Sequence, residues 1–315
     1  GEEVNHIPLD DEFRARFGNP YAVVHRADLH KEMVKACKEN TLIELCVNSE
    51  VIGYDQDGTS ATAHLASGDS VTGDLLVGAD GLHSAIRTKV VGDGAPRVSG
   101  HSTYRAVIPV DAMPEDLRWN AATLWMGPNC HLVHYPLSGW KVFNLVITKA
   151  NDATEVLAGE PLSRAEVHAN FDHIHDTPRR LIDLSEDWRV WVLCDRAPVE
   201  NWIDGRAVLL GDAAHPTLQY YAQGACMALE DGVCLSRTIE RNADDLDAAL
   251  AIYQERRVVR TARIQIGSRQ LGDNWFHVDG VHRKLRNEIM GSMTADDYYY
   301  QLKWLYGHNE AQMAA

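Results

Sequence analysis

The sequence has no closely spaced cysteine pair and no long apolar run, and a signal peptide is not expected. No stretch approaches the roughly 20 apolar residues that a transmembrane helix needs. The cysteines are scattered without a CxxC pair, which predicts reduced, mostly buried thiols in a cytoplasmic protein and no structural zinc. They are Cys37, Cys46, Cys130, Cys194, Cys226 and Cys234.

Positive charge is also scarce. Lys and Arg together number 30 against 45 Asp and Glu, which gives a formal net charge of −15. A surface this acidic repels phosphates, so nucleic acid and anionic membranes are not expected partners. A small anionic ligand remains possible, because a local pocket rich in donors can override the overall field.

The order of predicted elements indicates an α/β (α+β) fold. Residues 25–40 have the apolar spacing of an amphipathic helix, residues 41–58 read as a strand pair, and the polar N-terminal stretch resembles a hairpin. After Gly100 come β-rich segments separated by turns, and helix dominates from Gly224. The interpretation is one α/β domain interrupted by an antiparallel β-sheet domain. The predicted segments are 1–99 (α/β domain, first part), 100–192 (sheet), 193–268 (α/β domain, second part) and 269–315 (helical C-terminus).

The stretch "LLGDAAHPTLQYYAQGACMALED" joins a buried strand to a helix. The strand delivers Gly211-Asp212 at its carboxyl end, where open α/β sheets bind ligands. Gly224 then begins a helix whose first N–H groups are unpaired. An acid beside such donors suits the ribityl hydroxyls and the N1–C2=O edge of a reduced flavin. Alternatively, Asp212 only caps the turn and the small residues only pack.

A second strand-end motif is "DLLVGADGLHSAIR", with Asp80-Gly81 followed by Ser84 and Arg87 near the start of a helix. The guanidinium of Arg87 is able to hold a carboxylate or a phosphate by its fork of donors. Alternatively, Asp80-Gly81 is an ordinary turn and Arg87 pairs on the surface.

Two further signals lie on strands. In "CHLVHYPL", His131, Val133 and Tyr135 share one strand face, so an imidazole and a phenol are placed to contact a phenolic substrate. Arg26 in "VVHRADLH" precedes a helix. Alternatively, His131 is a satisfied structural residue and Arg26 a surface residue.

Taken in order, "GADGLHSAIR", a β-sheet region and "GDAAHP…QGACMALED" resemble the single-component flavoprotein aromatic hydroxylases, the class A family that includes para-hydroxybenzoate and salicylate hydroxylases. The resemblance extends over essentially the whole sequence. It implies that residues 1–99 and 193–268 are the two parts of a partial FAD-binding, Rossmann-like domain, and that residues 100–192 are the antiparallel β-sheet substrate domain that interrupts it. Within the family, "HPTLQYYAQGACMALED" and "HLVHYPL" look most similar to the enzymes that hydroxylate 3-hydroxybenzoate at position 6.

The resemblance implies a role for each site residue. Asp212 would bind the flavin ribityl chain, and Gly224 and Ala225 would offer N–H groups to the flavin ring. Arg26 would contact FAD, and Asp80 would contact both FAD and the pyridine nucleotide, with Arg87 supporting that motif. Three residues, His131, Tyr135 and Gln219, would line the substrate pocket, with Tyr220 close by.

The same resemblance implies the chemistry. NADH or NADPH reduces FAD, O2 adds at C4a, and the hydroperoxide transfers a hydroxyl group to an electron-rich ring. His131, with an ordinary pKa near 6.5, would accept the phenol proton. Tyr135 would position the ring and Gln219 would orient the substrate or the hydroperoxide. Attack para to the hydroxyl of 3-hydroxybenzoate gives 2,5-dihydroxybenzoate (gentisate).

One departure from the family pattern concerns the pyrophosphate. The family begins with a strand, a GxGxxG turn and a helix that hold this group, and no such element is found in residues 1–315. Roughly 80 residues of the pattern are missing before Gly1, about the size of a βαβ unit with extensions. We therefore expect these residues alone to bind FAD weakly, unless another segment or polypeptide supplies the unit.

Other functions stay open at this stage. Salicylate and 6-hydroxynicotinate hydroxylases are near neighbours, and flavin halogenases and polyketide-ring hydroxylases share both strand-end motifs. No Lys is placed between the sheet strands as a halogenase requires. The alternative outside the enzymes is a non-catalytic folded remnant or interaction module. The choice of NADH or NADPH and a homodimeric state, which is common in the family, are not decided by the sequence.

Overall fold

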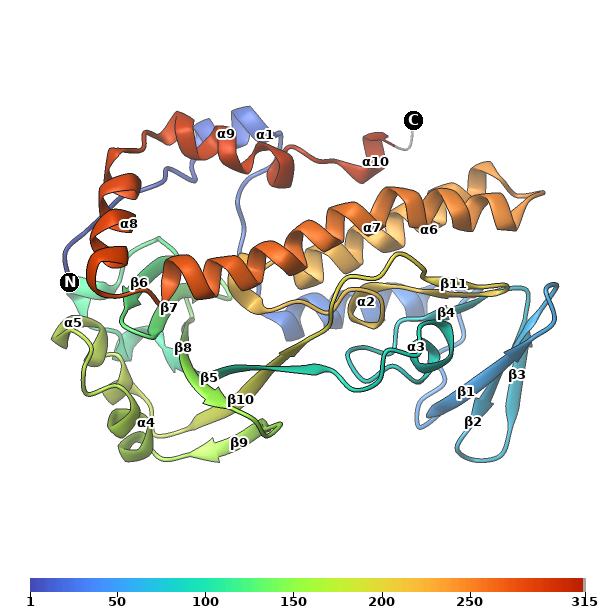
Figure 1. Ribbon diagram of the computed structural model, residues 1–315, viewed down its shortest axis with the longest axis horizontal. Coiled ribbons are helices and arrows are strands. Elements are labelled where there is room, and N and C mark those ends of the chain that lie inside the picture. Colours follow the sequence, from blue (N-terminus) through green and yellow to red (C-terminus); the bar gives the residue numbers. More distant parts are fainter. Residues whose placement is uncertain (314–315) are drawn as a thin grey trace. The chain divides into compact units, whose positions relative to one another are not determined.

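The computed structural model describes residues 1–313, and these fall into two compact units, each of which is described by itself (Figure 1). The sheet unit consists of Gly1–Leu45, Ser99–Leu193 and Asp273–His308. The helix unit consists of Cys46–Val98 and Cys194–Gly272, together with residues 309–313.

The sheet unit is built on a six-stranded sheet with the order β6-β7-β8-β5-β10-β9. The pairs β6–β7, β7–β8, β5–β8 and β9–β10 are antiparallel. Its strands are β5 (Arg97–Pro109), β6 (Thr123–Gly127), β7 (Cys130–Leu137), β8 (Val142–Ala153), β9 (Ala158–Leu162) and β10 (Trp188–Asp195). The β5–β8 pair lies in the middle of the sheet, and its register is regular from His101 to Pro109, with Tyr104 opposite Ile147 and an irregularity between Gly100 and His101.

The apolar core of the sheet unit forms on one side of these strands. Leu132, Leu145 and Ile147 pack there with Phe171 and Leu181 from the helical connection between β9 and β10. Burying each such side chain contributes about 1.5–3 kcal/mol. Side chains alternate along a strand, so His131, Val133 and Tyr135 occupy the face of β7 opposite to that of Leu132. The helices of this unit are α1 (Asp11–Phe17), α2 (Arg26–Glu39), α4 (Arg164–Asn170), α5 (Asp176–Arg179), α8 (Gly280–Ser292) and α9 (Ala295–Tyr306).

The helix unit contains the long neighbouring helices α6 and α7 and two small sheets (Figure 1). In one sheet, of order β11-β12-β4, β12 is parallel to β4. Its core places Val208 and Leu209 of β12 with Leu235 of α6 and Tyr253 of α7. The elements are β1 (Val51–Gln56), β2 (Ala61–Leu65), β3 (Ser70–Gly73), β4 (Leu76–Gly78), α3 (Ala85–Val90), β11 (Ile203–Asp204), β12 (Ala207–Leu209), α6 (Gly224–Arg241), α7 (Leu246–Leu271) and α10 (Glu310–Met313).

The structure corrects two sequence predictions near the N-terminus. Residues 11–17 form α1 and not a hairpin, because Asp10 caps the first turn, Gly18 ends the helix with φ +82°, and Phe13 packs edge-on against Tyr306. Of the strand pair predicted over residues 41–58, only β1 forms. Leu42 and Val47 lie on the surface, and residues 41–50 have no strand partner within residues 1–313.

The structure also bears on two expectations from composition, namely reduced cysteines and the lack of a membrane-spanning helix. Within residues 1–313 all six cysteines are free thiols. None of the helices in that range combines the length and the apolar character needed to cross a bilayer.

Candidate active site

The turn after β12 presents Asp212 to solvent. Gly211 adopts φ +62°, and a Cβ on it would lie 3.1 Å from the Cβ of Ala228 on α6, so only glycine fits without strain. This brings the strand end close to the helix and leaves the Asp212 side chain exposed. Within residues 1–313 its carboxylate makes no hydrogen bond or ion pair. It is therefore available to accept from a ligand hydroxyl.

The N-terminus of α6 lies beside this carboxylate. A Cβ built on Gly224 would be 4.0 Å from Oδ1 of Asp212. Gln223, which precedes the helix, makes no capping hydrogen bond with its side chain, so the first N–H groups, including those of Gly224 and Ala225, point out of an uncapped helix end. The Asp212 carboxylate can accept from the ribityl hydroxyls, and the first N–H groups of α6 can donate to the electron-rich C2 carbonyl of the flavin ring. The residues present therefore fit FAD.

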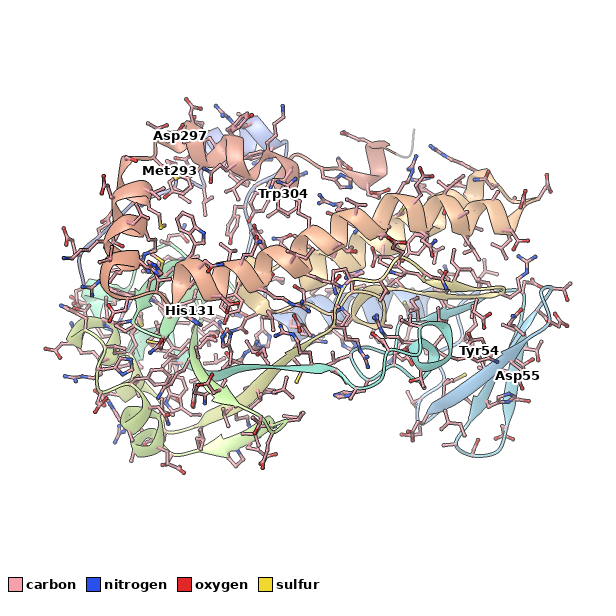
Figure 2. The ribbon with its side chains drawn as sticks, in the orientation of Figure 1. Tyr54, Asp55, His131, Met293, Asp297 and Trp304 are labelled. Carbon is pink, nitrogen blue, oxygen red and sulfur yellow. The ribbon has the colours of Figure 1, made fainter. Side chains whose placement is uncertain are left out.

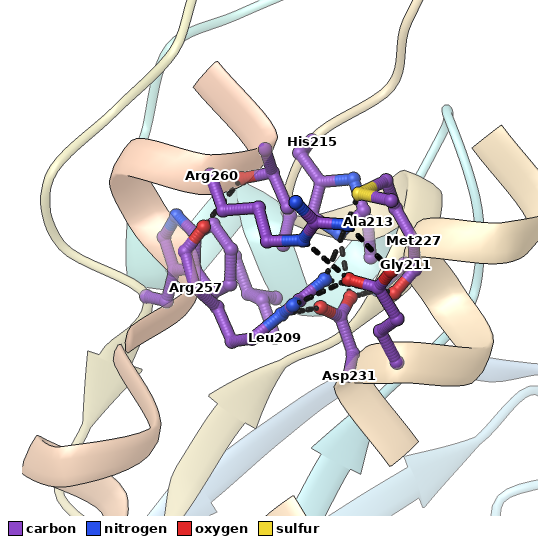
Figure 3. Close-up of polar contacts among 12 residues, drawn as sticks. Leu209, Gly211, Ala213, His215, Met227, Asp231, Arg257 and Arg260 are labelled. Atoms are coloured by element: carbon purple, nitrogen blue, oxygen red, sulfur yellow. Dashed lines mark hydrogen bonds and ion pairs between the residues drawn. The ribbon is translucent and has the colours of Figure 1, made fainter. Parts of the chain in front are cut away.

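The buried carboxylate of Asp231 holds the turn that carries Gly211 and Asp212 in place (Figure 3). Asp231 of α6 accepts from the backbone N–H of Gly211 at 3.0 Å, and its contacts with Nε2 of His215 and Nε of Arg257 measure 2.5 Å and 2.7 Å. Burial alone would raise the pKa of Asp231, but the His215 contact and the charge of Arg257 outweigh it and lower that pKa. The carboxylate is thus held ionised.

The contacts of Asp231 with His215 and Arg257 are part of a larger ion cluster between α6 and α7. Arg257 also donates to Glu230 at 2.7 Å, and Arg260 donates to the same carboxylate at 2.6 Å. Tyr253 donates its hydroxyl to the carbonyl of Leu209 at 3.0 Å, which fixes the end of β12. Sequence reasoning missed Asp231 and Arg257. The sequence signal that could have found them is an Asp and an Arg at helix positions expected to be buried. Charged residues are rarely buried unless they are paired.

The Asp80 motif forms a second organised turn in the same unit. The Asp80 carboxylate accepts from Oγ of Ser84 at 2.5 Å and from the N–H of Ala85 at 2.8 Å, at the start of α3. Ser84 in turn caps the N–H of Arg87 at 2.8 Å. Asp80 remains exposed, but part of its accepting capacity is used to cap α3.

Arg87 is fully buried and bonds to protein groups. It pairs with Asp93 at 2.7 Å and donates to the carbonyls of Ala213 and Ala214 at 2.8 Å and 2.6 Å. The sequence-based interpretation that this guanidinium binds a ligand anion is therefore wrong, since its donors face protein acceptors. Arg87 instead ties α3 to the backbone beside Asp212.

Gln219 and Tyr220 lie in the short helical turn η5 (Gln219–Tyr221) that leads to α6. Tyr220 is buried, and its ring lies against the backbone of Gly272, where a Cβ would come within 2.7 Å of Cζ. The helix unit thus brings together Asp212, Gly224, Ala225, Gln219 and Tyr220 in one segment between β12 and α6.

The remaining predicted residues belong to the sheet unit, where β7 carries His131 (labelled in Figure 2) and Tyr135. His131 is buried, and its Nδ1 lies 2.8 Å from Nε2 of His277. Burial lowers the pKa of His131 well below its usual range, and the neighbouring His277 and His101 lower it further. The imidazole is therefore a weaker base in the folded protein than its ordinary pKa near 6.5 implied.

Tyr135 and Arg26 are more accessible. Burial raises the pKa of Tyr135, although Arg105 opposes the shift. Tyr135 borders a hollow of about 130 Å³ together with Tyr21. Arg26 is exposed in the first turn of α2 and forms no hydrogen bond or ion pair within the described residues, so its charge is available to an anionic group.

Comparison with known proteins identifies the family. The family model described as "FAD binding domain" matches residues 8–264. The chain is 50% identical over 306 residues to 3-hydroxybenzoate 6-hydroxylase 1 of Aquipseudomonas alcaligenes, covering 97% of this chain and 77% of that protein. It is 45% identical to 3-hydroxybenzoate 6-hydroxylase of Polaromonas naphthalenivorans (strain CJ2), covering 98% of this chain and 77% of that protein.

Solved structures agree on the fold. The crystal structure of Klebsiella pneumoniae HpxO complexed with FAD and uric acid superposes with a TM-score of 0.81 at 24% identity, covering 94% of this chain and 76% of that chain. A salicylate hydroxylase substrate complex gives a TM-score of 0.78 at 22% identity, covering 92% and 75%. The chain therefore belongs to the FAD binding domain family and is a flavin-dependent monooxygenase.

Proposed function

We propose that the protein hydroxylates 3-hydroxybenzoate at carbon 6, para to the existing hydroxyl, and so forms 2,5-dihydroxybenzoate (gentisate). Reduced pyridine nucleotide and O2 are the co-substrates. The observation that carries the proposal is the 50% identity over 306 residues to a relative that is named for this reaction. The placement of His131 and Tyr135 on one face of β7 supports a phenolic substrate.

The residues that would hold FAD are those around the Asp212 turn. Asp212 would accept from the ribityl hydroxyls, and the N–H groups of Gly224 and Ala225 would donate to the flavin ring. Arg26 would contact an anionic part of FAD, and Asp80 would contribute to both FAD and pyridine-nucleotide binding. When bound, FAD supplies the transfer of one oxygen atom from O2 to the aromatic carbon.

The protein's own task is to make that carbon nucleophilic. Removing the phenol proton turns the hydroxyl into a phenolate, which donates electron density to the ortho and para positions. His131 would take this proton at the ring nitrogen that does not face His277. Tyr135 would position the ring and Gln219 would orient the substrate.

A direct test compares three acids with one enzyme preparation. We expect 3-hydroxybenzoate to stimulate NADH or NADPH oxidation and to yield gentisate by chromatography. Salicylate and 6-hydroxynicotinate should give less stimulation and no stoichiometric product. Full coupling with either of these two acids, and none with 3-hydroxybenzoate, would reassign the substrate while leaving the monooxygenase class intact.

A further inference from the structure

A hollow of about 420 Å³ lies at one side of the six-stranded sheet, and we call it the edge hollow. Residues of β5, β8, β9 and β10, of the segment between β8 and β9, and of the end of α4 line it, all within the sheet unit (Figure 1). Its polar lining includes Tyr104, Asp152 and Glu155, and its apolar lining includes Val190 and Val192. Its volume is sufficient for a small organic molecule.

The edge hollow lies on the face of the sheet opposite to His131 and Tyr135. Tyr104 pairs across the sheet with Ile147, which in turn pairs with Leu132. Residues that pair directly across neighbouring strands point to the same face, so Tyr104 shares the face of Leu132. His131 and Tyr135 alternate with Leu132 along β7 and occupy the other face. A molecule in the edge hollow is therefore not expected to compete with the aromatic substrate.

A buried phenol forms the floor of the edge hollow. The side chain of Tyr104 is only 4% exposed, and its ring lies edge-on to Phe171 at a centroid distance of 5.2 Å. Its hydroxyl makes no hydrogen bond within residues 1–313, yet the oxygen is not enclosed by protein atoms, so it reaches the hollow. Burial raises the pKa of Tyr104, so the hydroxyl keeps its proton at neutral pH. A buried tyrosine hydroxyl normally has a hydrogen-bond partner, which here has to come from a group in the hollow.

The mouth of the edge hollow is negative. Asp152 and Glu155 are exposed, and neither carboxylate makes a hydrogen bond or ion pair within residues 1–313. No Lys or Arg is among the described residues that line the hollow. The nearby Lys149 donates to the carbonyl and Oδ1 of Asn170 at 3.1 Å and 3.2 Å. The mouth should therefore attract a cation and repel a carboxylate or a phosphate.

The apolar lining limits where a ligand can carry its charge. Val190 and Val192 are buried, and Leu162 is half-buried beside them in the lining. Aliphatic walls of this kind favour a hydrocarbon segment. A charged group at the buried floor would have no counter-charge, which is costly, so the group that meets Tyr104 should be neutral.

We propose that the edge hollow is a second small-molecule binding site and that it takes an aliphatic amino alcohol. The ammonium group faces Asp152 and Glu155 at the mouth, the hydrocarbon chain lies against the aliphatic walls, and the hydroxyl of the ligand bonds to that of Tyr104 on the floor. The site is independent of the proposed hydroxylation, because it uses the other face of the sheet.

Calorimetric titration with 6-amino-1-hexanol at low ionic strength tests the site. This probe has no aromatic ring, so it does not resemble the proposed substrate. We expect a Kd of about 1 mM or below. Hexylamine, which lacks the hydroxyl, and 1-hexanol, which lacks the amine, should each bind about three- to tenfold more weakly. No detectable binding of 6-amino-1-hexanol up to about 10 mM, or equally tight binding of the anion 6-hydroxyhexanoate, would overturn the proposal.

Tyr104→Phe tests the floor. The hydroxyl has no protein partner within residues 1–313, so its removal breaks no hydrogen bond of the fold. We expect the Kd for 6-amino-1-hexanol to rise about three- to tenfold and the Kd for hexylamine to stay the same. A variant that binds both amines as tightly as the wild type does would show that the phenol is not part of a binding site.

The double variant Asp152→Asn, Glu155→Gln tests the mouth. Both amines should bind about three- to tenfold more weakly, whereas 1-hexanol should be unaffected. The matched control is Glu160→Gln, Asp187→Asn, which removes the same charge from exposed positions of the sheet unit outside the lining. Equal weakening in the two double variants would mean that the overall negative charge, and not this mouth, attracts the amine, and would overturn the assignment.

A competition experiment locates the probe. Saturating 3-hydroxybenzoate should leave the Kd for 6-amino-1-hexanol unchanged, because the two molecules use opposite faces of the sheet. Displacement of the probe by 3-hydroxybenzoate would place it on the His131 face and overturn the proposal. If no phenolic acid is hydroxylated but the titrations behave as expected, the proposed function fails while the amino-alcohol site stands.

Discussion

The backbone N–H of Gly211 donates to the fully buried carboxylate of Asp231, 3.0 Å away. Through this bond and the contact of Asp231 with His215, the ion cluster between α6 and α7 fixes the turn that presents Asp212. Rigid support of this kind is what a cofactor site requires, because a ligating side chain is only as well placed as the backbone that carries it. The stability of the cluster and the affinity for FAD should therefore be linked.

Replacing Arg257 by Met should test this support. The substitution removes the guanidinium from the buried carboxylate of Asp231, which keeps only its contact with His215, and we expect the free energy of unfolding to fall by about 3–5 kcal/mol. Urea denaturation measures the change. The matched control is Arg237→Met on α6, which breaks an exposed pair with Glu240 and should change stability by no more than about 0.5 kcal/mol. Equal losses in the two variants would mean that the buried cluster is not what stabilises the unit.

Gly211→Ala should destabilise the protein more than Gly58→Ala. Both positions have a positive φ, +62° and +85°, so an alanine at either one would adopt a strained left-handed backbone conformation. Only at Gly211 would the added Cβ meet another side chain, Ala228, at 3.1 Å, whereas nothing lies within 4 Å at Gly58. We expect an additional loss of about 1–3 kcal/mol for Gly211→Ala in thermal or urea denaturation. Equal losses would show that α6 moves to accommodate the methyl group.

Asp212→Asn should weaken FAD binding and leave stability unchanged. The carboxylate is exposed and has no protein partner within residues 1–313, so its replacement breaks nothing in the fold. A hydrogen bond to a charged group is worth about 1.5–3 kcal/mol, which corresponds to a Kd roughly ten- to a hundredfold higher. Flavin fluorescence titration measures it, with exposed Asp244→Asn as the control. An unaltered Kd would remove Asp212 from the cofactor site.

Local patterns predicted the elements that carry the site. The strand at Cys130–Leu137 and the helix beginning at Gly224 were both expected, because alternation and a small-residue helix start are encoded within a few neighbouring residues. The stretch 41–50 misled the same reasoning, since its apolar residues have the composition of a strand but remain unpaired within residues 1–313. A strand depends on its partner as well as on its own side chains.

Contacts between distant residues were beyond local patterns. His277 is 146 residues from His131 in the sequence and lies in an irregular segment after α7. Arg87 was recognised as part of a motif, but its acceptors at Ala213 and Ala214 come from another strand end and could not be read from spacing. Which polar groups face one another is decided by tertiary packing, and a single sequence does not display it.

His131→Ala should reduce hydroxylation of 3-hydroxybenzoate by about a hundredfold or more, because the variant lacks the base proposed for the phenol proton. NADH oxidation should continue, since reduction of FAD does not use that proton, so the ratio of product to NADH consumed should fall. The loss of NADH absorbance and the gentisate yield, measured together, give this ratio, with His64→Ala as control. A normal ratio and a normal rate would exclude His131 from the proposed mechanism.

Stability should decline as the pH falls below about 6.5, where histidines of the unfolded chain begin to bind protons. Burial lowers the pKa of His277 to about 3 and that of His134 to about 4, so the folded protein does not bind those protons until much lower pH. The unfolded state is therefore favoured by up to about 1.4 kcal/mol per pH unit for each histidine between pH 6.5 and 4. Urea denaturation at several pH values measures the slope. His277→Phe should make it shallower and His83→Phe, at an exposed position, should not; identical slopes in all three proteins would contradict a neutral buried His277.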